Sequence, residues 1–362
     1  MKKTILLSII FLLLSAGFVS AQESEIPIDM FQYQEPTATY YEKAKILEIS
    51  GFGEIQDINL KILSGKYKGE EKTVENSMLY NPLGLEFKVN NKVVVYIEEF
   101  ADGTSSLYIQ DFWRLWPLIG LIIGFLLLLL IVGRMQGFKT ILSLIISIVL
   151  IFYFLIPRML DGGNPIVLAL IISVIVTVIT LLLVSGLKKK SVAAILGTIG
   201  GLLIATVLAI TIGKIANMTG LSNEESRLLY ANFPNLNLRG LLFAGIIIGA
   251  LGAIMDVGMS IASSIAEVKK AHSKISFTGL VKSGLTIGRD IMGTMTNTLI
   301  FAYVGVSLPL LLLFTELGES YIKFLNFEFI AEEVIRAMTG SIGLIATLPL
   351  TAIIAAYLES KK

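Results

Sequence analysis

Long apolar runs fill most of the chain after residue 112, and each is long enough to cross a lipid bilayer as a helix. Short polar stretches separate them, so the pattern predicts an α-helical polytopic membrane protein with about seven spans. Residues 275–288, ISFTGLVKSGLTIG, leave six or eight spans open, as a surface helix or a re-entrant segment. The predicted spans cover residues 117–133, 141–157, 165–186, 191–213, 241–265, 291–314 and 337–357.

A different pattern occupies residues 22–111, where apolar and polar residues alternate over short runs. In DINLKILSG, for example, Ile58, Leu60 and Ile62 share one face, which is typical of a strand with one buried side. The pair Asn90-Asn91 predicts a tight hairpin turn. These features predict a small antiparallel barrel or sandwich, with an OB-like barrel as one option. Strands are predicted at residues 43–49, 57–65, 85–89, 92–100 and 106–112.

The N-terminus has the pattern of a secretory signal peptide. Two lysines precede an apolar run that ends in the small residues Val19-Ser20-Ala21. We predict cleavage after Ala21, with an uncleaved anchor as the alternative. The predicted organisation is a signal peptide (1–21), an extracytoplasmic β domain (22–111) and a transmembrane helical domain (112–362).

Composition agrees with a membrane protein and excludes several kinds of site. Of the 362 residues, 54% are hydrophobic and 16% are charged, whereas about a quarter of an average soluble domain is charged. The net charge of +1 gives no reason to expect nucleic acid as a partner. Without cysteine and with His272 as the only histidine, thiolate and bis-histidine metal sites are excluded. We predict no cofactor, and any bound cation would need oxygen ligands.

Basic residues predict the orientation of the spans. With the β domain outside, the predicted inner connections hold more lysine and arginine than the outer ones, as the positive-inside rule requires. Trp113 and Trp116 lie just before the first span, where interfacial aromatic residues are expected. The predicted protein therefore has its N-terminal domain outside and its C-terminus in the cytoplasm.

Small residues stand out in the fourth predicted span and polar residues in the fifth. The run GTIGG at 197–201 predicts close packing of helices. In the fifth span, Asp256 lies deep within the apolar run, with Ser260 and Ser263 four and seven residues later on one helical face. A carboxylate at the centre of a bilayer costs roughly 2.5–3.5 kcal/mol, so it normally faces a cavity or a partner.

The sixth predicted span repeats this arrangement, with Asp290, Thr294 and Asn297 at the same offsets. If the two antiparallel helices pack together, Asp256 would lie level with Asn297, and Asp290 level with Ser263. The result would be a ladder of oxygen ligands for an ion or a small solute.

Structural explanations of the same residues remain open. Arg289 and Asp290 would then form an ion pair beside the headgroups, or Asp256 would form a buried salt bridge with Arg289. Serine and threonine also bond back to their own helix, so their hydroxyls alone are weak evidence of a path.

The seventh predicted span begins with charged residues. Glu333 and Arg336 are three residues apart, with Thr339 a turn deeper, which predicts a local ion pair with a structural or gating role. Pro309 in SLPL and Pro349 in TLPL predict breaks or kinks in the last two spans. Such breaks either adjust packing or mark the binding site of a transporter.

Several stretches resemble the YibE/F-like family of bacterial membrane proteins. They are KILSGKYKGEE (61–71), GALGAIMDVGMSIASSI, GRDIMGTMTNTLIFAYVG and AMTGSIGLIATLPLTA. The resemblance covers roughly residues 110–358 and the segment at 61–71. It implies a multi-pass protein of a bacterial plasma membrane but no catalytic residue, because the activity of the family is not established.

Two functions follow from these patterns. The first is a permease for an ion or a small solute, with a polar path formed by the fifth to seventh spans and driven by an ion gradient or a partner ATPase. The second is a non-transporting accessory or signalling protein whose external β domain binds a partner. A homo-oligomer or a partner membrane protein fits either function. An intramembrane aspartyl protease is disfavoured, because the chain has neither a Tyr-Asp nor a Gly-x-Gly-Asp motif. We therefore expect no enzyme activity.

Overall fold

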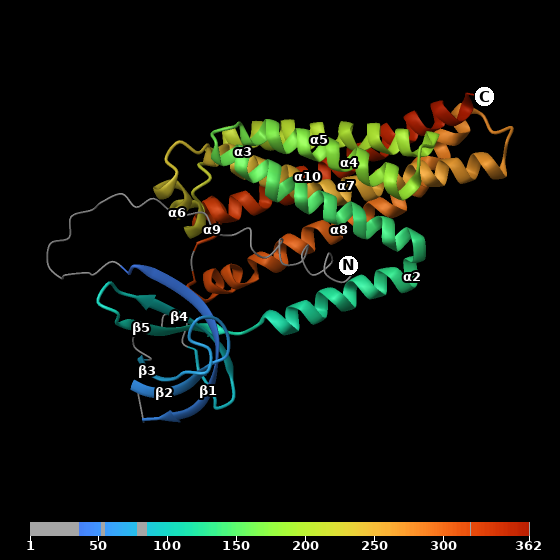
Figure 1. Ribbon diagram of the computed structural model, residues 1–362. Helices are drawn as coiled ribbons and strands as arrows, with labels where there is room; N and C mark the ends of the chain where they lie inside the picture. The colour runs from blue at the N-terminus through green and yellow to red at the C-terminus, as the bar shows by residue number, and fades with distance from the viewer. Residues whose placement is uncertain (1–35, 52–54, 78–84, 319, 362) are drawn as a thin grey trace. The chain divides into compact units, whose positions relative to one another are not determined.

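The computed structural model describes residues 36–51, 55–77, 85–318 and 320–361. They form two compact units, divided between Leu128 and Leu129. The first unit contains the strands, and the second contains most of the long helices (Figure 1). The predicted signal peptide lies outside the described residues.

The first unit is built on one curled antiparallel sheet (Figure 1). Its strand order is β3-β2-β1-β4-β5. The edge strands approach each other, since Lys72 Nζ on β3 donates a hydrogen bond of 2.9 Å to Ser105 Oγ on β5. The strands are β1 (Ala38–Ser50), β2 (Ile55–Ile62), β3 (Glu71–Ser77), β4 (Lys92–Glu99) and β5 (Ser105–Phe112).

The alternating residues form the core of this sheet as predicted. Ile58, Leu60 and Ile62 on β2 are fully buried, and Val95 and Ile97 on β4 are buried in the same cluster. A strand places alternate side chains on opposite faces, so one face of each strand supplies the core and the other lies outside it.

Two details of the predicted sheet are wrong. Residues 85–88 form no strand, although Phe87 is buried in the core. Asn90 and Asn91 do form a tight turn, but Asn90 N donates to Ile46 O, so the turn leads into β4 and does not join two strands. The remaining strand is β3, EKTVENS, in which Val74 is the only large apolar residue. Such an edge strand has too little alternation to be recognised.

A cluster around Glu99 ties the loop after β2 to the end of β4. Lys66 Nζ and Tyr67 OH both donate to Glu99 Oε1, and Tyr40 OH donates to Glu99 Oε2 at 3.4 Å. The hydrogen bond from Lys66, followed by that from Tyr67, holds the pKa of Glu99 below its ordinary value of 4.5. The contribution of Glu99 to stability is therefore present above that value and is lost as the pH falls through the lowered pKa.

We expect Glu99→Gln to flatten the acid side of the stability profile of this unit. The wild type should lose stability as the pH falls below about 4.5, whereas the variant has no carboxylate to protonate. Urea unfolding of the full chain at several pH values, followed by the fluorescence of Trp113 and Trp116, would measure this. Both tryptophans lie beside the sheet, with Lys43 Nζ over the two rings. The exposed Glu86→Gln is the control, and an identical acid profile for wild type and Glu99→Gln would contradict the prediction.

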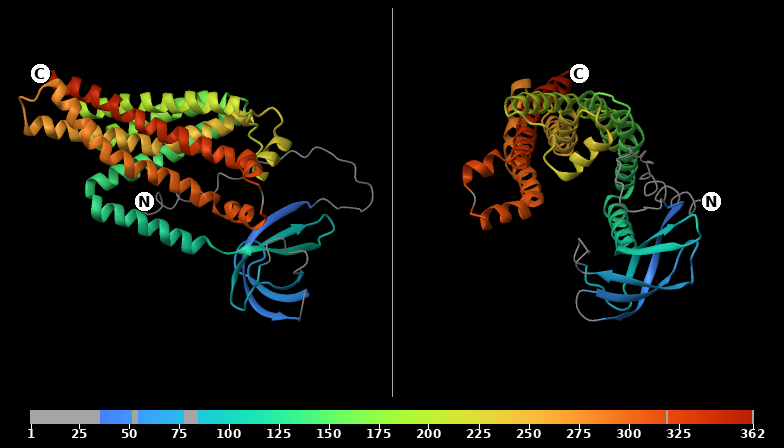
Figure 2. Two further views of the ribbon diagram at one scale, coloured as in Figure 1. Left: turned by 180° about the vertical axis from the view of Figure 1, so that it is seen from behind. Right: turned by 90° about the vertical axis from the view of Figure 1, so that its left-hand side faces the viewer.

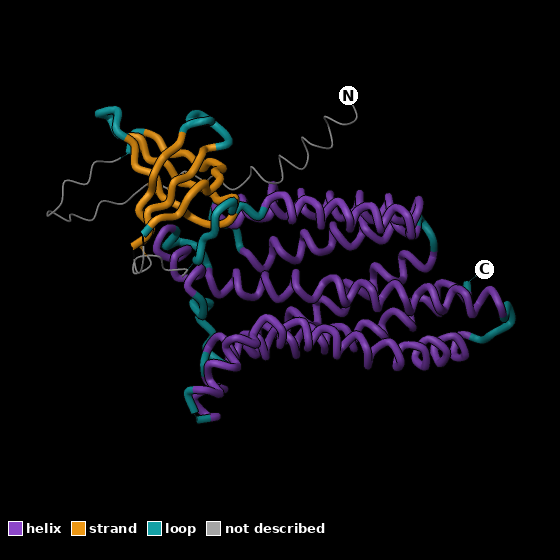
Figure 3. The backbone as a smooth tube through the Cα atoms, turned by 90° about the horizontal axis from the view of Figure 1, so that it is seen from below, coloured by secondary structure: helices purple, strands orange, loops and turns teal. Residues whose placement is uncertain are grey.

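The helices of the chain are mostly long and run side by side (Figure 3). Six helical stretches of the described chain are long and apolar enough to cross a membrane, judged by length and composition. The helices are α2 (Leu115–Leu150), the π-helical turn η1 (Ile151–Leu155), α3 (Ile156–Leu160), α4 (Pro165–Ser185), α5 (Lys189–Ile215), α6 (Glu224–Asn232), α7 (Leu238–Ala271), α8 (Phe277–Glu316), α9 (Tyr321–Asn326) and α10 (Glu328–Ser360).

The helix α2 turns back on itself at Arg134, whose φ of 48° and ψ of −126° are not helical. The carbonyl oxygen of Leu129 lies so close to Gly137 that a β-carbon there would overlap it. In a straight helix these two residues would be about 12 Å apart along the axis. The stretch counted as one apolar helix is therefore two segments joined by a sharp reversal.

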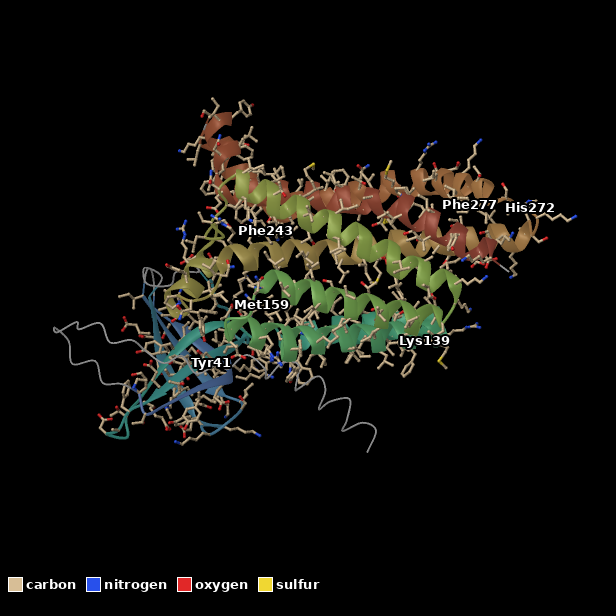
Figure 4. The ribbon with its side chains drawn as sticks, turned by 90° about the horizontal axis from the view of Figure 1, so that it is seen from above. Tyr41, Lys139, Met159, Phe243, His272 and Phe277 are labelled. Carbon is tan, nitrogen blue, oxygen red and sulfur yellow. The ribbon has the colours of Figure 1, made fainter. Side chains whose placement is uncertain are left out.

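Residues 275–288 do not form an element of their own. After Ile275 and the cap residue Ser276, whose Oγ accepts from Gly279 N at 3.2 Å, they form the first turns of α8. Figure 4 shows the short turn between α7 and α8 by its labelled residues His272 and Phe277.

The helices α8 and α10 both continue through Pro309 and Pro349, so neither proline breaks its helix, and the alternative of a kink stays a prediction. A proline removes one backbone hydrogen bond, and a long helix held by its neighbours tolerates that loss.

The helices α5 and α10 approach closely through the predicted glycines. A β-carbon on Gly197 would overlap Thr351, and one on Gly201 would overlap Thr347 and the carbonyl oxygen of Gly343. These contacts confirm the prediction that the small residues of GTIGG allow two helices to pack closely.

Candidate polar site on helices α7 and α8

The helix α7 is the centre of the bundle. Asn237 caps its first turn, with Oδ1 accepting from Gly240 N at 2.8 Å, and Lys269 and Lys270 lie in its last turn, where they offset the helix dipole. It packs against α4, α5, α8 and α10. Seen along the helices, α8 in orange and α4 in green lie on either side of it (Figure 2, right).

One face of α7 lies mostly outside these contacts, the exception being Gly249, where a β-carbon would stand 3.0 Å from the hydroxyl of Tyr303 on α8, and we call this face the α7 stripe. Its members recur every three or four residues, are exposed except for the half-buried Ser263, and are all small or acidic. They are Gly245, Gly249, Gly252, Asp256, Ser260 and Ser263. Beyond the adjacent backbone of α7 itself, no described atom lies within 4 Å of the place where a β-carbon on Gly245 or Gly252 would stand.

The position of the α7 stripe follows from its neighbours. Each residue advances about 100° around a helix. Met259, whose Sδ accepts from Ser185 Oγ of α4 at 3.6 Å, therefore lies about 60° to one side of Asp256. Ile261, which packs beside Gly288 of α8, lies about 140° to the other side. The α7 stripe thus lies between the flanks that contact α4 and α8.

Asp256 has neither a hydrogen bond nor an ion pair within the described residues. In particular, the alternative salt bridge between Asp256 and Arg289 is absent, and no ion pair joins Arg289 to Asp290. Ser263 accepts at 3.5 Å from Lys190 Nζ, near the end of the bundle. The carboxylate of Asp256 is therefore free to interact with something that is not part of this chain's described core.

The polar face of α8 is the second predicted set, and we call Asp290, Thr294 and Asn297 the α8 stripe. All three residues are exposed. Thr294 Oγ1 donates to Ile291 O of its own helix at 3.0 Å, so part of its polarity is satisfied locally. The spacing correctly predicted that these residues share one face of one helix.

The predicted ladder between α7 and α8 is not formed. Gly284 packs beside Ile265, and Gly288 beside Ile261, which places Asp256 level with Gly293, one helical turn from Asn297. Asp290 points about 120–160° away from these two glycines, and Asp256 about 140–180° away from the two isoleucines. The α7 and α8 stripes therefore lie on adjacent helices but do not face each other.

The charged start of α10 forms the predicted ion pair and extends it. Arg336 NH1 lies 3.7 Å from Glu333 Oε1, and Arg336 NH2 lies closer to Glu332 Oε1. Glu332 is buried, and its second oxygen accepts from Ser222 Oγ. Thr339 is buried and donates to Ile335 O at 2.7 Å, which is a structural role.

Sequence reasoning missed Glu332 and its neighbour Glu328. Glu328 accepts from Gly220 N at 3.0 Å and from Thr219 Oγ1 at 2.9 Å, so it holds the loop that follows α5. Glu328, Glu332 and Arg336 are each four residues apart in the sequence. That spacing could have predicted that the three charged side chains share one face of a helix.

This arrangement defines a class of protein in which a small curled β domain precedes a bundle of long apolar helices, one of which exposes a stripe of small residues around a single aspartate. The chain belongs to the YibE/F-like family. The model of the YibE/F-like protein matches residues 121–361, and the model of the YibE/F family N-terminal domain matches residues 52–112. No curated protein and no solved structure matches the chain.

Proposed function

We propose that the protein spans a bacterial plasma membrane seven times, with its β domain outside and its C-terminus in the cytoplasm. Six long apolar helical stretches, the first of which reverses at Arg134, supply the seven segments. Basic residues support this orientation, because lysines gather at one end of the bundle, as the positive-inside rule requires of the cytoplasmic end. At that end Lys189 Nζ donates to Lys361 O, and Lys190 Nζ donates to Ser263 Oγ. The strand order, with β3 close to β5, is consistent with an OB-like barrel.

Within that frame we propose a permease for an ion or a small solute whose path is lined by the α7 stripe. The observation that carries this proposal is Asp256, an acid without a partner among the described residues, in the middle of a long apolar helix. A carboxylate at such a depth is stable where water, an ion or another protein meets it. Gly245 and Gly252 of the α7 stripe leave room for a passing solute, whereas the hydroxyl of Tyr303 lies beside Gly249.

The outward α8 stripe supports a homo-oligomer or a partner membrane protein in the same proposal. Asp290 and Asn297 are exposed on α8, a helix long and apolar enough to cross a membrane. Within a bilayer, such side chains are stabilised when another helix covers them.

Flux through proteoliposomes tests the permease. The full chain would be reconstituted with a dye inside that is selective for the ion under test, and H⁺, Na⁺, K⁺ and Mg²⁺ gradients would be imposed in turn. We expect flux above that of empty liposomes for at least one ion, and Asp256→Asn should lower it by roughly tenfold or more, equivalent to about 1.4 kcal/mol or more in barrier height. An amide neither carries a proton nor attracts a cation as a carboxylate does.

Glu267→Gln is the matched control, because Glu267 lies on the same face at the end of α7, where Lys270 Nζ is 3.9 Å from it. Its flux should equal that of the wild type. Unchanged flux in a folded Asp256→Asn variant would remove Asp256 from the path. No flux of any of the four ions through the wild type would favour the second candidate function.

That second candidate is an accessory protein whose β domain binds a partner. A row of three tyrosines crosses neighbouring strands, since Tyr41 pairs with Tyr96 and Tyr96 with Tyr108. The rings of Tyr41 and Tyr96 are 5.0 Å apart, and about half of Tyr41 and of Tyr108 is exposed. Exposed aromatic rings in a row are suited to contacts with a flat apolar or sugar surface.

A further inference from the structure

Three lysines form a row across the outer face of the sheet, and we call them the lysine row. They are Lys61 on β2, Lys45 on β1 and Lys92 on β4, and Lys45 lies directly opposite each of the other two in the strand pairing. Their neighbours Ala44 and Val93 are buried in the core, so the lysines lie on the other face. Like charges directly opposite each other destabilise a sheet. The lysine row therefore lowers stability unless an anion lies against it.

The described residues balance only one charge of the lysine row. Glu71 on β3 pairs with Lys61, with its Oε1 3.1 Å from Nζ. The side chains of Lys45 and Lys92 have neither a hydrogen bond nor an ion pair within the part of the chain that the structure describes. Glu48, the next charged residue after Lys45 on β1, is separated from it by a shift in the strand register. Two positive charges of the row are therefore available to an anion outside this set of residues.

The lysine row lies beside the start of α2. Trp113 N donates to Lys92 O at 2.8 Å, two residues before that helix begins. On the same face as Lys45, Lys43 Nζ lies 5.2 Å from the ring centre of Trp113 and 6.0 Å from that of Trp116. Trp116 is 61% exposed, so most of it lies outside the core of the domain. Exposed tryptophans at the start of an apolar helix are typical of the headgroup region of a bilayer.

This position selects the anion that can reach the lysine row. On the proposed topology, on which this inference rests, α2 enters the membrane just after Trp116, so the headgroups lie level with the two tryptophans. A strand rises about 3.3 Å per residue, which places Lys45 about 7 Å along β1 from Lys43, the lysine that lies over both rings. Phospholipid headgroups carry phosphate, and each lysine close to an anionic membrane surface changes the affinity for it roughly fivefold.

We propose that the β domain docks on the membrane surface through the lysine row, and that its partner there is a patch of anionic phospholipid headgroups. Lys45 and Lys92 donate to phosphate oxygens of the lipids, which offsets the repulsion within the row, and Lys43 lies at the edge of the contact beside the tryptophans. The tyrosine row of the second candidate function is not part of this contact, because Tyr41 lies about 13 Å from Lys45 along β1.

A fluorophore at residue 89 tests the proposal on the full chain in lipid nanodiscs. The chain has no cysteine, so Val89→Cys, at an exposed position three residues before Lys92, provides a single labelling site. Lipids with a spin label on the headgroup quench a fluorophore that approaches the membrane surface. We expect strong quenching in nanodiscs that contain phosphatidylglycerol and weak quenching in phosphatidylcholine alone. A label at Ala101→Cys is the control, because the turn after β4 lies more than about 20 Å from Lys92 along the strand and should not respond to lipid charge.

Lysine variants connect the quenching to the lysine row. Lys45→Gln and Lys92→Gln should each shift the equilibrium from the docked to the undocked domain by roughly fivefold, whereas Lys68→Gln, at an exposed position in the loop after β2, should dock as the wild type does.

Three results would overturn the proposal. They are equal quenching with and without phosphatidylglycerol, wild-type docking by the double variant Lys45→Gln with Lys92→Gln, and loss of the quenching when inorganic phosphate is added at constant ionic strength, which would assign the row to a free anion. Failure of the proposed topology is detected separately, because a chain that does not span the membrane would be released from vesicles by an alkaline wash, and this result would overturn both proposals.

Discussion

Gly201→Ala should lower the apparent melting temperature of the protein by roughly 6–12 °C. A β-carbon at this position would overlap both the side chain of Thr347 and the carbonyl oxygen of Gly343. A backbone carbonyl cannot rotate away, so α5 and α10 must separate, and overpacking of this kind costs about 3 kcal/mol at its upper end. For a chain of this size each kcal/mol corresponds to roughly 2–4 °C.

The neighbouring Gly200→Ala is the matched control for that prediction. Its β-carbon would meet only the end of the Leu350 side chain, at 2.8 Å, and a leucine methyl group can move. Both variants gain the same helix propensity, up to about 1 kcal/mol. The difference between their melting temperatures therefore reports the contact between α5 and α10 alone. Thermal unfolding of the full chain in detergent would measure both. Equal melting temperatures would mean that α5 and α10 are not held at this close distance.

Arg336→Met should destabilise the helical unit by about 3 kcal/mol, because it leaves the buried Glu332 and the partly buried Glu333 without a counter-charge. Glu332 is 7% exposed, and its side chain accepts hydrogen bonds from both Arg336 and Ser222. The arginine side chain is 25% exposed. We therefore expect the loss of stability to lie at the lower end of the range for a broken buried ion pair.

The double variant Glu332→Gln with Arg336→Met separates the charge effect from lost packing. It restores the net charge of the group, and glutamine keeps an acceptor for Ser222. We expect it to recover most of the stability that Arg336→Met loses, measured by the same thermal unfolding. If the double variant is as unstable as the single one, the ion pair does not account for the effect.

Local patterns were sufficient for most of the secondary structure. Alternation in DINLKILSG placed the core face of β2, because the period of a strand decides which side chains point to the same side. Alternation could not predict β3, an edge strand with one large apolar residue. It wrongly predicted a strand at residues 85–89, where Phe87 is buried in the core although the segment pairs with no strand. Pairing between strands is a tertiary property.

The same division holds for the helices. Apolar length predicted where they lie, but neither the continuation of α8 through Pro309 nor the reversal at Arg134 within α2 could be derived from it. Neighbouring helices stabilise a helix around a proline, and a non-helical backbone at one residue is enough to reverse the chain.

The sequence by itself determined that Asp256, Ser260 and Ser263 share one face of a helix, and that Asp290, Thr294 and Asn297 share another, since helical geometry depends only on spacing. Only the tertiary structure decided where those faces point. Gly284 and Gly288 let α8 approach Ile265 and Ile261, and the close contact of these apolar faces turned both polar stripes away from the interface. Helices pack through the faces that come closest together, and a list of polar residues does not identify those faces.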